Sequence, residues 1–396
     1  MSIYEDPQVL NRAKLEMSQG IERLYLLSFC LACCWPGYSA VSNLRVVRQW
    51  PELQFNFPSP EAEQIARQNR FDEGRPMTLG TVDVQGRISA YPDYAWHADQ
   101  GFNCQGMTSV FRVAQVCPPQ LLAFDLTTDR LIYRHVVNAS SYVEASLFIT
   151  PVVDVRGQGP GDCADTFVYV ADVSAFGVLV VDVTRDRSWR VTHRLYFPYP
   201  NRGTFTIDVL GMSLSPYRAG RDRYLYFHAL ASVTENVMFT NILRNDTHIF
   251  DTDLDPNDIH VTEAVDRDGV MYFGLMDPPS IWCWNIETEF SRRNFHQVAI
   301  DHETLQFASG VKVVNNLKGE QELWILTSSF QRVMTGSLSS DKVNFRIHAE
   351  KIPILMANSP CRMNSPPNGK RPGYHANLVE QKKHRLHYRY GAVAFL

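Results

Sequence analysis

The chain has 396 residues, of which 45% are hydrophobic, and its formal net charge is −4. This hydrophobic fraction is enough for a substantial core and argues against global disorder, and the nearly balanced charge provides no strong field for nucleic acid or acidic membranes. Aromatic residues make up 12% of the chain, which also contains 22 Gly and 22 Pro. That composition favours a fold rich in strands and turns.

The N-terminal region is predicted to be an export signal. An apolar run, LYLLSFCLACCW from residue 24 to residue 35, follows Arg23 and precedes small residues at positions 37–42. The run is shorter than the roughly 20 apolar residues that cross a bilayer, and this layout is typical of a secretory signal peptide. We expect residues 1–42 to be a signal peptide with a polar leader, which a start at Met17 would shorten to normal length. The alternative is a buried N-terminal helix.

The rest of the chain is expected to be secreted, extracellular and without a membrane span, because no later stretch is long and apolar enough to cross a bilayer. N-glycosylation sequons at Asn138 and Asn245 fit export, although such triplets also arise by chance. In an exported chain most cysteines pair, and an odd number leaves one over. The five cysteines beyond the leader are Cys104, Cys117, Cys163, Cys283 and Cys361.

Three local patterns predict secondary structure in the first half of the chain. Residues 60–70 (PEAEQIARQNR) are predicted to form a helix, with Ser59 as N-cap and Pro60 in the first turn. Residues 122–137 (LAFDLTTDRLIYRHVV) and 167–183 (FVYVADVSAFGVLVVDV) each hold two apolar runs split by a short turn, which is typical of a β-hairpin.

A coarse repeat follows, with units that begin near Gly211, Glu263 and Gly310. Each unit combines a small-residue strand, a charged turn, an aromatic-rich strand and an outer strand, the last of these predicted at residues 333–338 in the third unit. Units about 50 residues apart are typical of propeller blades, which stack to bury both faces of each small sheet. A two-sheet sandwich is the alternative, and doubly wound α/β is disfavoured because helical periodicity is nearly absent.

Several segments in order resemble the insect Yellow/major royal jelly protein family, from about residue 50 to residue 373. Their number and order carry the resemblance, and no single motif decides it. The segments are YPDYAWH (91–97), GMTSVFRV (106–113), QVCPPQLL (115–122), CADTFVY (163–169), RDRSWRV (185–191), GMSLSP (211–216), CWN (283–285) and CRMN (361–364). The resemblance implies an all-β, six-bladed β-propeller over residues 43–373. Residues 374–396 are expected to be a basic, flexible tail.

The chain departs from the family pattern in two places. A strand pair that members carry between the segments ending at Gly74 and beginning at Arg75 is missing, and Ala114 alone stands where members have a cysteine-containing Leu-Trp-Val strand. A splice form or a gene-model error would produce such a chain. Unpaired backbone groups are costly when buried, so we expect blade one to be incomplete, with low order near residues 71–90.

The resemblance also implies a disulfide pattern. The lost cysteine looks like the family partner of Cys163, so Cys163 is expected to be unpaired. Cys104 is then expected to pair with Cys117, and Cys283 with Cys361. The second bridge would close a loop of about 80 residues and contribute about 4 kcal/mol in the loop-entropy model.

No motif identifies a metal, a cofactor or a catalytic nucleophile, and we expect neither metal nor cofactor. His296, Asp301 and His302 are close in sequence but lack H-E-x-x-H spacing. Gly-x-Ser-x-Gly is absent. The glycine-rich stretch at residues 156–161 is not followed by the Lys-Ser/Thr pair of a phosphate-binding loop.

Ligands of propellers usually enter the central channel at one end. By resemblance to amine-binding salivary members, the positions that would contact a ligand are Val311, Ser328 and Phe330, where those members use threonine and an asparagine-glycine-phenylalanine element. Phe330 could stack on an aromatic ring or be part of the core, whereas Val311 cannot donate a hydrogen bond. Asp172 and Asp208 are possible channel carboxylates, with turn or capping roles as the alternative.

The resemblance implies a role in melanin, cuticle or eggshell pigmentation and leaves three functions open. The chain could convert dopachrome, bind biogenic amines, or serve as a non-catalytic protein of extracellular matrix or cuticle, for which the Tyr and His residues of the tail are suited. A small aromatic amine or quinone is the expected ligand, and no nucleic acid is expected. A tautomerase needs a general base beside the acidic carbon, and the sequence identifies none.

Overall fold

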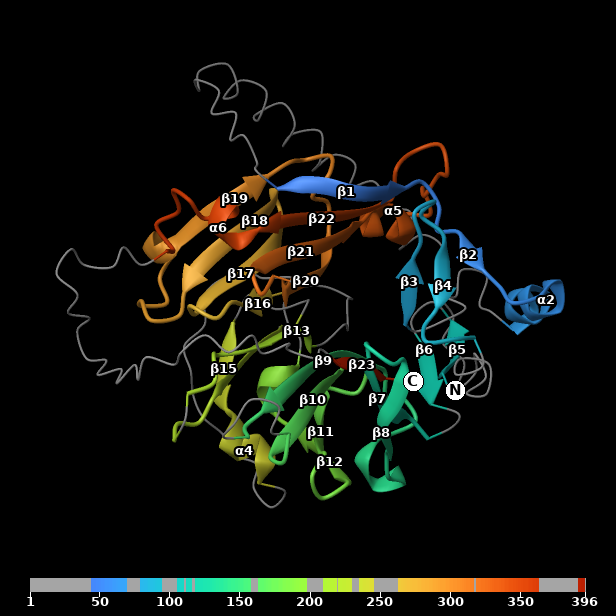
Figure 1. The fold of residues 1–396 in the computed structure, drawn as a ribbon, viewed down its shortest axis with the longest axis horizontal. Coiled ribbons are helices and arrows are strands. Elements are labelled where there is room, and N and C mark those ends of the chain that lie inside the picture. The colour runs from blue at the N-terminus through green and yellow to red at the C-terminus, as the bar shows by residue number, and fades with distance from the viewer. Residues whose placement is uncertain are drawn as a thin grey trace, which may run out of the picture. The chain divides into compact units, whose positions relative to one another are not determined.

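The computed structural model describes residues 44–69, 79–94, 105–109, 112–115, 118–157, 163–197, 209–218, 220–229, 235–245, 263–316, 318–362 and 391–395. The chain divides into two units, Met1–Val41 and Ser42–Leu396, and all described residues belong to the second. They form mostly antiparallel β-sheets with a few short helices (Figure 1).

Four sheets follow one another from residue 148 onward. The first contains, in spatial order, β9 (Phe148–Val155), β10 (Thr166–Asp172), β11 (Gly177–Asp182) and β12 (Arg187–Thr192). The second contains β13 (Val209–Leu214), β14 (Tyr224–Ala229) and β15 (Asn236–Phe239). The third contains β16 (Glu263–Val265), β17 (Val270–Met276), β18 (Pro279–Asn285) and β19 (Phe295–Ile300). The fourth contains β20 (Ala308–Asn315), β21 (Gln321–Ser328), β22 (Phe345–Lys351) and the N-terminal strand β1 (Arg45–Trp50).

The first strands of these sheets are neighbours in space. β9 contacts β13, β13 contacts β16, and β16 contacts β20, so each sheet turns its first strand toward the same inner side (Figure 1). Sheets that stack in this way are the blades of a propeller, because each covers a face of the next. The predicted all-β propeller is confirmed, and the number of six blades stays a prediction.

Apolar side chains fill the space between successive blades. Tyr169 and Phe227 lie in the cluster between the first two sheets, and Tyr272 and Ile325 in the cluster between the last two. Every residue of β10 and β11 is buried. This burial on both faces explains why their sequence is almost continuously apolar and does not alternate.

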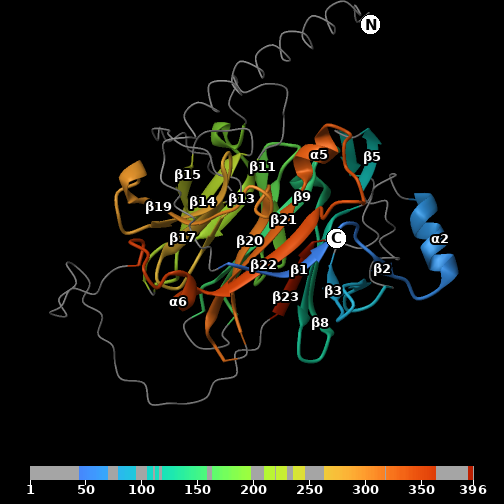
Figure 2. The same ribbon diagram turned by 90° about the horizontal axis from the view of Figure 1, so that it is seen from above.

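The fourth sheet joins the two ends of the repeat region. β1 pairs with β22 as its outermost strand, and Figure 2 shows the two side by side. The N-terminal segment thereby completes the sheet whose other three strands come from residues 308–351. This pairing between distant parts of the chain leaves no unpaired outer edge on β22.

The local predictions from the first half are confirmed. Helix α2 (Pro60–Asn69) ends one residue earlier than expected, and the Ser59 hydroxyl accepts the Ala62 amide at 3.2 Å as an N-cap. The first hairpin joins β7 (Gln120–Asp125) to β8 (Arg130–Val136). The second joins β10 to β11. The short helices are η1 (Ala139–Ser141), η2 (Arg194–Tyr196), α4 (Thr240–Arg244), η3 (Arg292–Asn294), α5 (Phe330–Met334) and α6 (Ile352–Leu355).

The predicted strand at residues 333–338 is wrong. This segment holds the end of α5 and a turn, in which Gly336 has φ 64°, and the outer strand of the unit is β22. Val333 and Leu338 are 38% and 42% exposed. A short apolar run indicates a strand only when one face of it is buried, and these two side chains are not buried.

The described residues in the region of the expected incomplete blade form small sheets. β2 (Phe55–Asn56), β4 (Ile88–Ala90) and β3 (Gly80–Val82) form one, and β5 (Gln105–Ser109) pairs with β6 (Arg112–Gln115) in another. The expected low order is wrong for residues 79–90, because they form a hairpin whose turn is closed by an Arg87 amide to Asp83 carboxylate bond of 2.8 Å. Residues 71–78 lie outside the described part.

Part of one face of the fourth sheet is exposed. The β3–β4 hairpin contacts β1 on this face, through a 2.6 Å bond from the Trp50 indole to the Gly86 carbonyl and a 3.3 Å bond from the Arg48 guanidinium to the Val84 carbonyl. On the same face of the fourth sheet, nearer the centre, Val314, Trp324 and Leu326 are 39%, 38% and 44% exposed. In a complete propeller the next blade covers such a face.

Part of the tail that we expected to be flexible forms a strand. β23 (Gly391–Phe395) pairs with β7, in a sheet of the order β23-β7-β8. The remainder of the expected tail, residues 374–390, lies outside the described part, as does the expected signal peptide. Among the described helices, none has both the length and the apolar character of a transmembrane helix.

Candidate functional site

The end of the ring where the innermost strands begin carries three groups of buried polar side chains. In a propeller the innermost strands run in the same direction, so their first residues gather at one end. Near the start of β9 is Asp172, near the start of β13 are His228 and Glu235, and near the start of β20 is His348. Each group is supplied by neighbouring strands of one blade.

The His228–Glu235 pair is the group best suited to proton transfer. The Nδ1 atom of His228 lies 3.0 Å from the Glu235 carboxylate, and the two side chains are only 1% and 4% exposed. When ionised, the Glu235 carboxylate can only accept a hydrogen bond; Nδ1 then donates to it, and Nε2 is the basic nitrogen. This carboxylate–imidazole arrangement fixes both tautomer and ring orientation.

Gly211 makes room for this pair on the innermost strand. Gly211 is the register partner of His228, beside a bulge in the β13–β14 pairing. A Cβ atom at Gly211 would lie 2.2 Å from the His228 ring, which is closer than real atoms approach. The imidazole therefore occupies the space that any other residue would fill and lies against the strand nearest the centre of the ring.

His348 belongs to a second polar group, on the fourth sheet. Its Nε2 atom lies 2.9 Å from the Thr304 carbonyl oxygen, which also accepts the Thr327 hydroxyl at 2.9 Å. Burial lowers the pKa of His348, and the nearby Arg346 lowers it further, against the opposing effects of the Thr304 hydrogen bond and of Asp301. The imidazole is therefore neutral near pH 7 and is tied into the backbone of the loop that precedes β20.

Asp172 has a structural role. Its carboxylate accepts the Ser146 hydroxyl at 2.7 Å, the Leu147 amide at 2.9 Å and the Arg190 guanidinium at 3.1 Å. It thereby holds the segment before β9 against β10 and β12. This is the capping role that was the alternative to a channel carboxylate. Asp208, the other possible channel carboxylate, lies outside the described residues.

The three predicted ligand contacts lie on or next to the neighbouring strands β20 and β21. Ser328 and Phe330 lie at the end of β21, where the Phe330 ring stacks on Phe307 with centroids 4.5 Å apart. Val311 is 1% exposed and packs in the core cluster of the last two sheets, opposite Ile325. A ligand-binding role for these residues stays a prediction.

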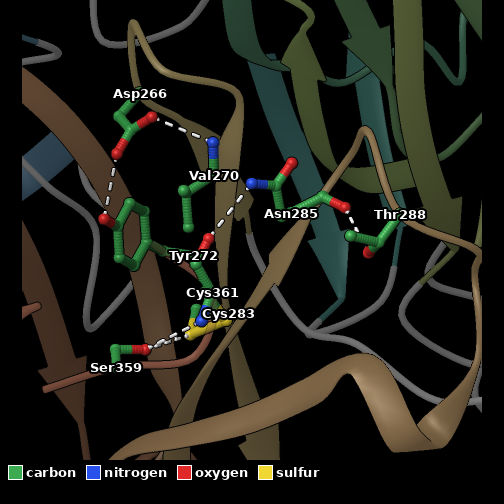
Figure 3. The surroundings of a disulfide bond; sticks show 8 residues. All are labelled: Asp266, Val270, Tyr272, Cys283, Asn285, Thr288, Ser359 and Cys361. Atoms are coloured by element: carbon green, nitrogen blue, oxygen red, sulfur yellow. Dashed lines mark hydrogen bonds between the residues drawn. A yellow bond between two sulfur atoms is a disulfide. The ribbon is translucent and has the colours of Figure 1, made fainter. Parts of the chain in front are cut away.

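The Cys283–Cys361 disulfide implied by the resemblance is present, with a Cα–Cα distance of 6.2 Å (Figure 3). It joins β18 to the loop after α6, and the Asn285 amide donates to the Cys361 carbonyl at 3.1 Å beside it. Cys163 is free and exposed, as expected. Cys104 and Cys117 lie outside the described residues, so their pairing stays a prediction.

The predicted glycosylation sites are both exposed. Asn138 precedes η1, and its side-chain oxygen accepts the Ser140 amide at 3.1 Å. Asn245 ends α4. Glycosylation at either asparagine stays a prediction. Within the described ranges, no group of three or more His, Cys, Asp or Glu side chains is placed to hold a metal ion.

The sequence patterns did not reveal the His228–Glu235 pair. The two residues are seven positions apart in a stretch that carries no known motif, and their role depends on the register that sets His228 opposite Gly211. The sequence shows Gly211 near the start of an expected inner strand, but it does not show that His228 lies opposite. Only the strand pairing brings Gly211 and His228 together.

Comparison with known proteins identifies the family. The family model described as major royal jelly protein matches residues 105–361, which is more than half of the chain. The chain is 28% identical to the dopaminechrome tautomerase of Drosophila melanogaster over 345 residues, covering 74% of this chain and 73% of that protein. It is 27% identical to protein yellow of Drosophila erecta, covering 87% and 76%. It is 24% identical to major royal jelly protein 9 of Apis mellifera, covering 85% and 95%.

The family-model match covers β5 to α6 and includes the strands that position His228 and Gly211 and both cysteines of the disulfide. They agree with the order of motifs seen in the sequence and with the all-β propeller of the structure. The chain belongs to the Yellow/major royal jelly protein family.

Proposed function

We propose that the protein is secreted, acts in melanin, cuticle or eggshell pigmentation, and isomerises a quinone of the dopachrome type. The similarity to a protein named dopaminechrome tautomerase and to the yellow proteins supports the substrate class. The buried His228–Glu235 pair supports the chemistry and is the observation on which the proposal depends.

The reaction requires proton transfer and no external oxidant. A proton leaves one saturated carbon of the substrate ring, the electron pair moves into the conjugated quinone system, and a proton is added to one quinone oxygen, which gives a quinone methide isomer. A second proton transfer, from the neighbouring saturated carbon to the other quinone oxygen, gives a dihydroxyindole with the same composition as the substrate. A positioned general base accelerates such a step by typically 10²–10⁴-fold.

His228 is proposed as the base that removes the carbon-bound proton. Its Nδ1 hydrogen bond to Glu235 orients the ring and stabilises the imidazolium that forms after proton transfer. The lack of a side chain at Gly211 lets the ring approach the innermost strand, and therefore the centre of the ring of blades. Burial of the pair excludes water that would compete for the proton.

The stacked rings of Phe307 and Phe330 favour a second candidate, the binding of an aromatic amine at the same end. One face of Phe330 is occupied by Phe307, and the residue is partly exposed. A flat ring or an ammonium group could contact its remaining surface. This candidate predicts binding without turnover.

The test is to incubate the secreted protein with dopachrome and with dopaminechrome and to follow the loss of quinone absorbance. We expect turnover by the intact chain and a 10²–10⁴-fold loss in kcat for His228→Gln. Glu235→Gln keeps the shape but removes the charge that stabilises the imidazolium, so kcat is expected to fall as well. His302→Gln, at an exposed histidine, is the matched control and is expected to keep full activity.

Failure of the intact chain to convert either quinone would contradict the catalytic proposal. Calorimetry with dopamine and serotonin then distinguishes an amine binder from a matrix protein that neither binds nor converts. Equal activity of His228→Gln and the intact chain would show that another residue is the base.

A further inference from the structure

The inner edge of β7 differs from the inner edges of the other blades. In the four sheets that follow, the strand that occupies the innermost position comes from the chain immediately before the second strand. Before β7, the chain forms β6, which pairs with β5, and only residues 116–119 separate β6 from β7. Within the described residues, no segment directly before β7 is therefore left to pair with this edge.

β23 occupies this position from the far end of the sequence. It pairs with β7 in antiparallel register from Gly391 opposite Asp125 to Phe395 opposite Leu121. It also contacts β9, the innermost strand of the next sheet, and Figure 1 shows it between β9 and β7. The C-terminal strand β23 thus occupies the innermost position in the sheet that contains β7 and β8.

The surroundings of β7 explain what kind of strand this edge accepts. Leu121, Leu122 and Phe124 are each 1% exposed, so the sheet is deeply buried around its inner strand. An open edge there would leave backbone N–H and C=O groups without partners, at a cost of about 1–3 kcal/mol for each buried group. The sequence GAVAFL has no charged side chain, whereas residues 382–389, shortly before it, include four Lys or Arg residues.

The connection to the rest of the chain imposes little constraint on the strand. The 28 residues 363–390 separate Cys361 and Arg362 from Gly391. Fully extended, they span about 95 Å at about 3.4 Å per residue, and the entropy of closing a loop grows only slowly with its length. A strand on such a tether can leave its edge and return without disturbing the other blades.

We propose that the β7 edge is a strand-binding site for an uncharged, apolar, extended peptide, and that its occupant is the chain's own C-terminal segment, residues 391–395. The segment binds reversibly in the same molecule and completes a blade that has no innermost strand of its own. Main-chain hydrogen bonds supply the affinity, as in other cases of strand addition to a sheet edge. The apolar surroundings of β7 select against charged sequences.

A cross-linking experiment tests the pairing in the full chain. In a Cys163→Ser background, Ala123→Cys and Val393→Cys place two thiols directly opposite each other. The control combines Ala123→Cys with Ala392→Cys, one position along β23, because adjacent strand residues point to opposite faces of a sheet. We expect mild oxidation to link the first pair within one chain and the control pair at least 10-fold less.

A peptide experiment tests the binding site. A chain that ends at Tyr390 is expected to bind a labelled peptide of residues 391–396, and the full chain at least 10-fold more weakly because its site is occupied. The same peptide with Val393→Pro lacks a backbone donor and is expected not to bind.

Three results would overturn the proposal. Equal linking of the matched and control pairs would exclude the register. A link found only between two chains would mean that the occupant comes from a second copy. Equal peptide binding by the full and the shortened chain would show that the peptide binds elsewhere. The cross-linking experiment does not depend on the shortened chain being able to fold.

Discussion

At the scale of single residues, buried polar side chains lie in an otherwise apolar interior. His228, Glu235 and His348 are inside the molecule, where an imidazole or a carboxylate is retained only if it is hydrogen-bonded. Each of the two histidines is fixed by a partner that depends on the fold, a carboxylate for His228 and a backbone carbonyl for His348. The first arrangement suits proton transfer, and the second stabilises a loop.

His348 predicts a pH dependence of stability. Its pKa is lowered in the folded state, mainly by burial, so the native state prefers the neutral imidazole. The stabilisation is complete above the ordinary pKa of about 6.5 and is lost as the pH falls through the lowered value. We expect the Tm advantage of the intact chain over His348→Gln to shrink between pH 7 and pH 5.

The exposed His302 provides the comparison for this measurement, because His302→Gln removes a histidine that is in contact with solvent. Its Tm difference from the intact chain is expected to stay constant over the same range. A constant difference for His348→Gln as well would refute the assignment of the pH effect to this residue.

At the scale of elements, the disulfide matters because it fixes the last described loop to a central strand. Cys283 lies in β18, and Cys361 follows α6 after a separation of 78 residues. Both cysteines belong to the core cluster of the third and fourth sheets. The bridge therefore joins the end of the fourth blade to the third.

Removing this bridge by Cys283→Ser with Cys361→Ser is expected to lower the free energy of unfolding by about 4 kcal/mol, because the unfolded chain regains the entropy of a long loop. Denaturant unfolding measures the change. Cys163→Ser, which removes the free exposed thiol, is expected to change stability by less than about 0.5 kcal/mol. Equal midpoints for the two variants would contradict the prediction.

At the scale of the whole molecule, a network of ion pairs connects the first two of the four consecutive sheets. Asp154 of β9 accepts the Arg223 guanidinium at 3.0 Å and the Tyr169 hydroxyl at 3.2 Å. Asp222 accepts Arg244 at 2.6 Å and lies 3.3 Å from Arg156. Burial lowers the pKa of Arg223, and Asp154 opposes that effect, so this charge depends on its partner across the blade boundary.

Asp154→Asn is expected to lower the free energy of unfolding by about 3–5 kcal/mol, because it leaves the buried Arg223 charge without its counter-ion. Asp165→Asn is the matched control, since Asp165 is 55% exposed and lies 3.5 Å from Arg156. Its loss is expected to stay below about 1 kcal/mol. Chemical denaturation followed by tryptophan fluorescence compares the two, and similar losses would mean that the network does not hold the blades together.

Local physical chemistry explains what the sequence by itself determined. The Ser59 cap, the turns after β7 and β10, and the spacing of the units each depend on residues that are close along the chain. The family was also inferred from motifs in the sequence, and the Cys283–Cys361 bridge from the resemblance to that family. The export signal stays a prediction, because it lies outside the described part. The strand predicted at residues 333–338 was wrong because a short apolar run does not specify burial.

Only the tertiary structure decided which distant residues meet. The pairing of His228 with Glu235 above Gly211 depends on a bulge and a register that no local pattern encodes. The placement of residues 391–395 beside β7 depends on which sheet edge the rest of the fold leaves open. Both outcomes depend on strand pairing. Backbone groups must find partners once they are buried, and they become buried only when the blades assemble.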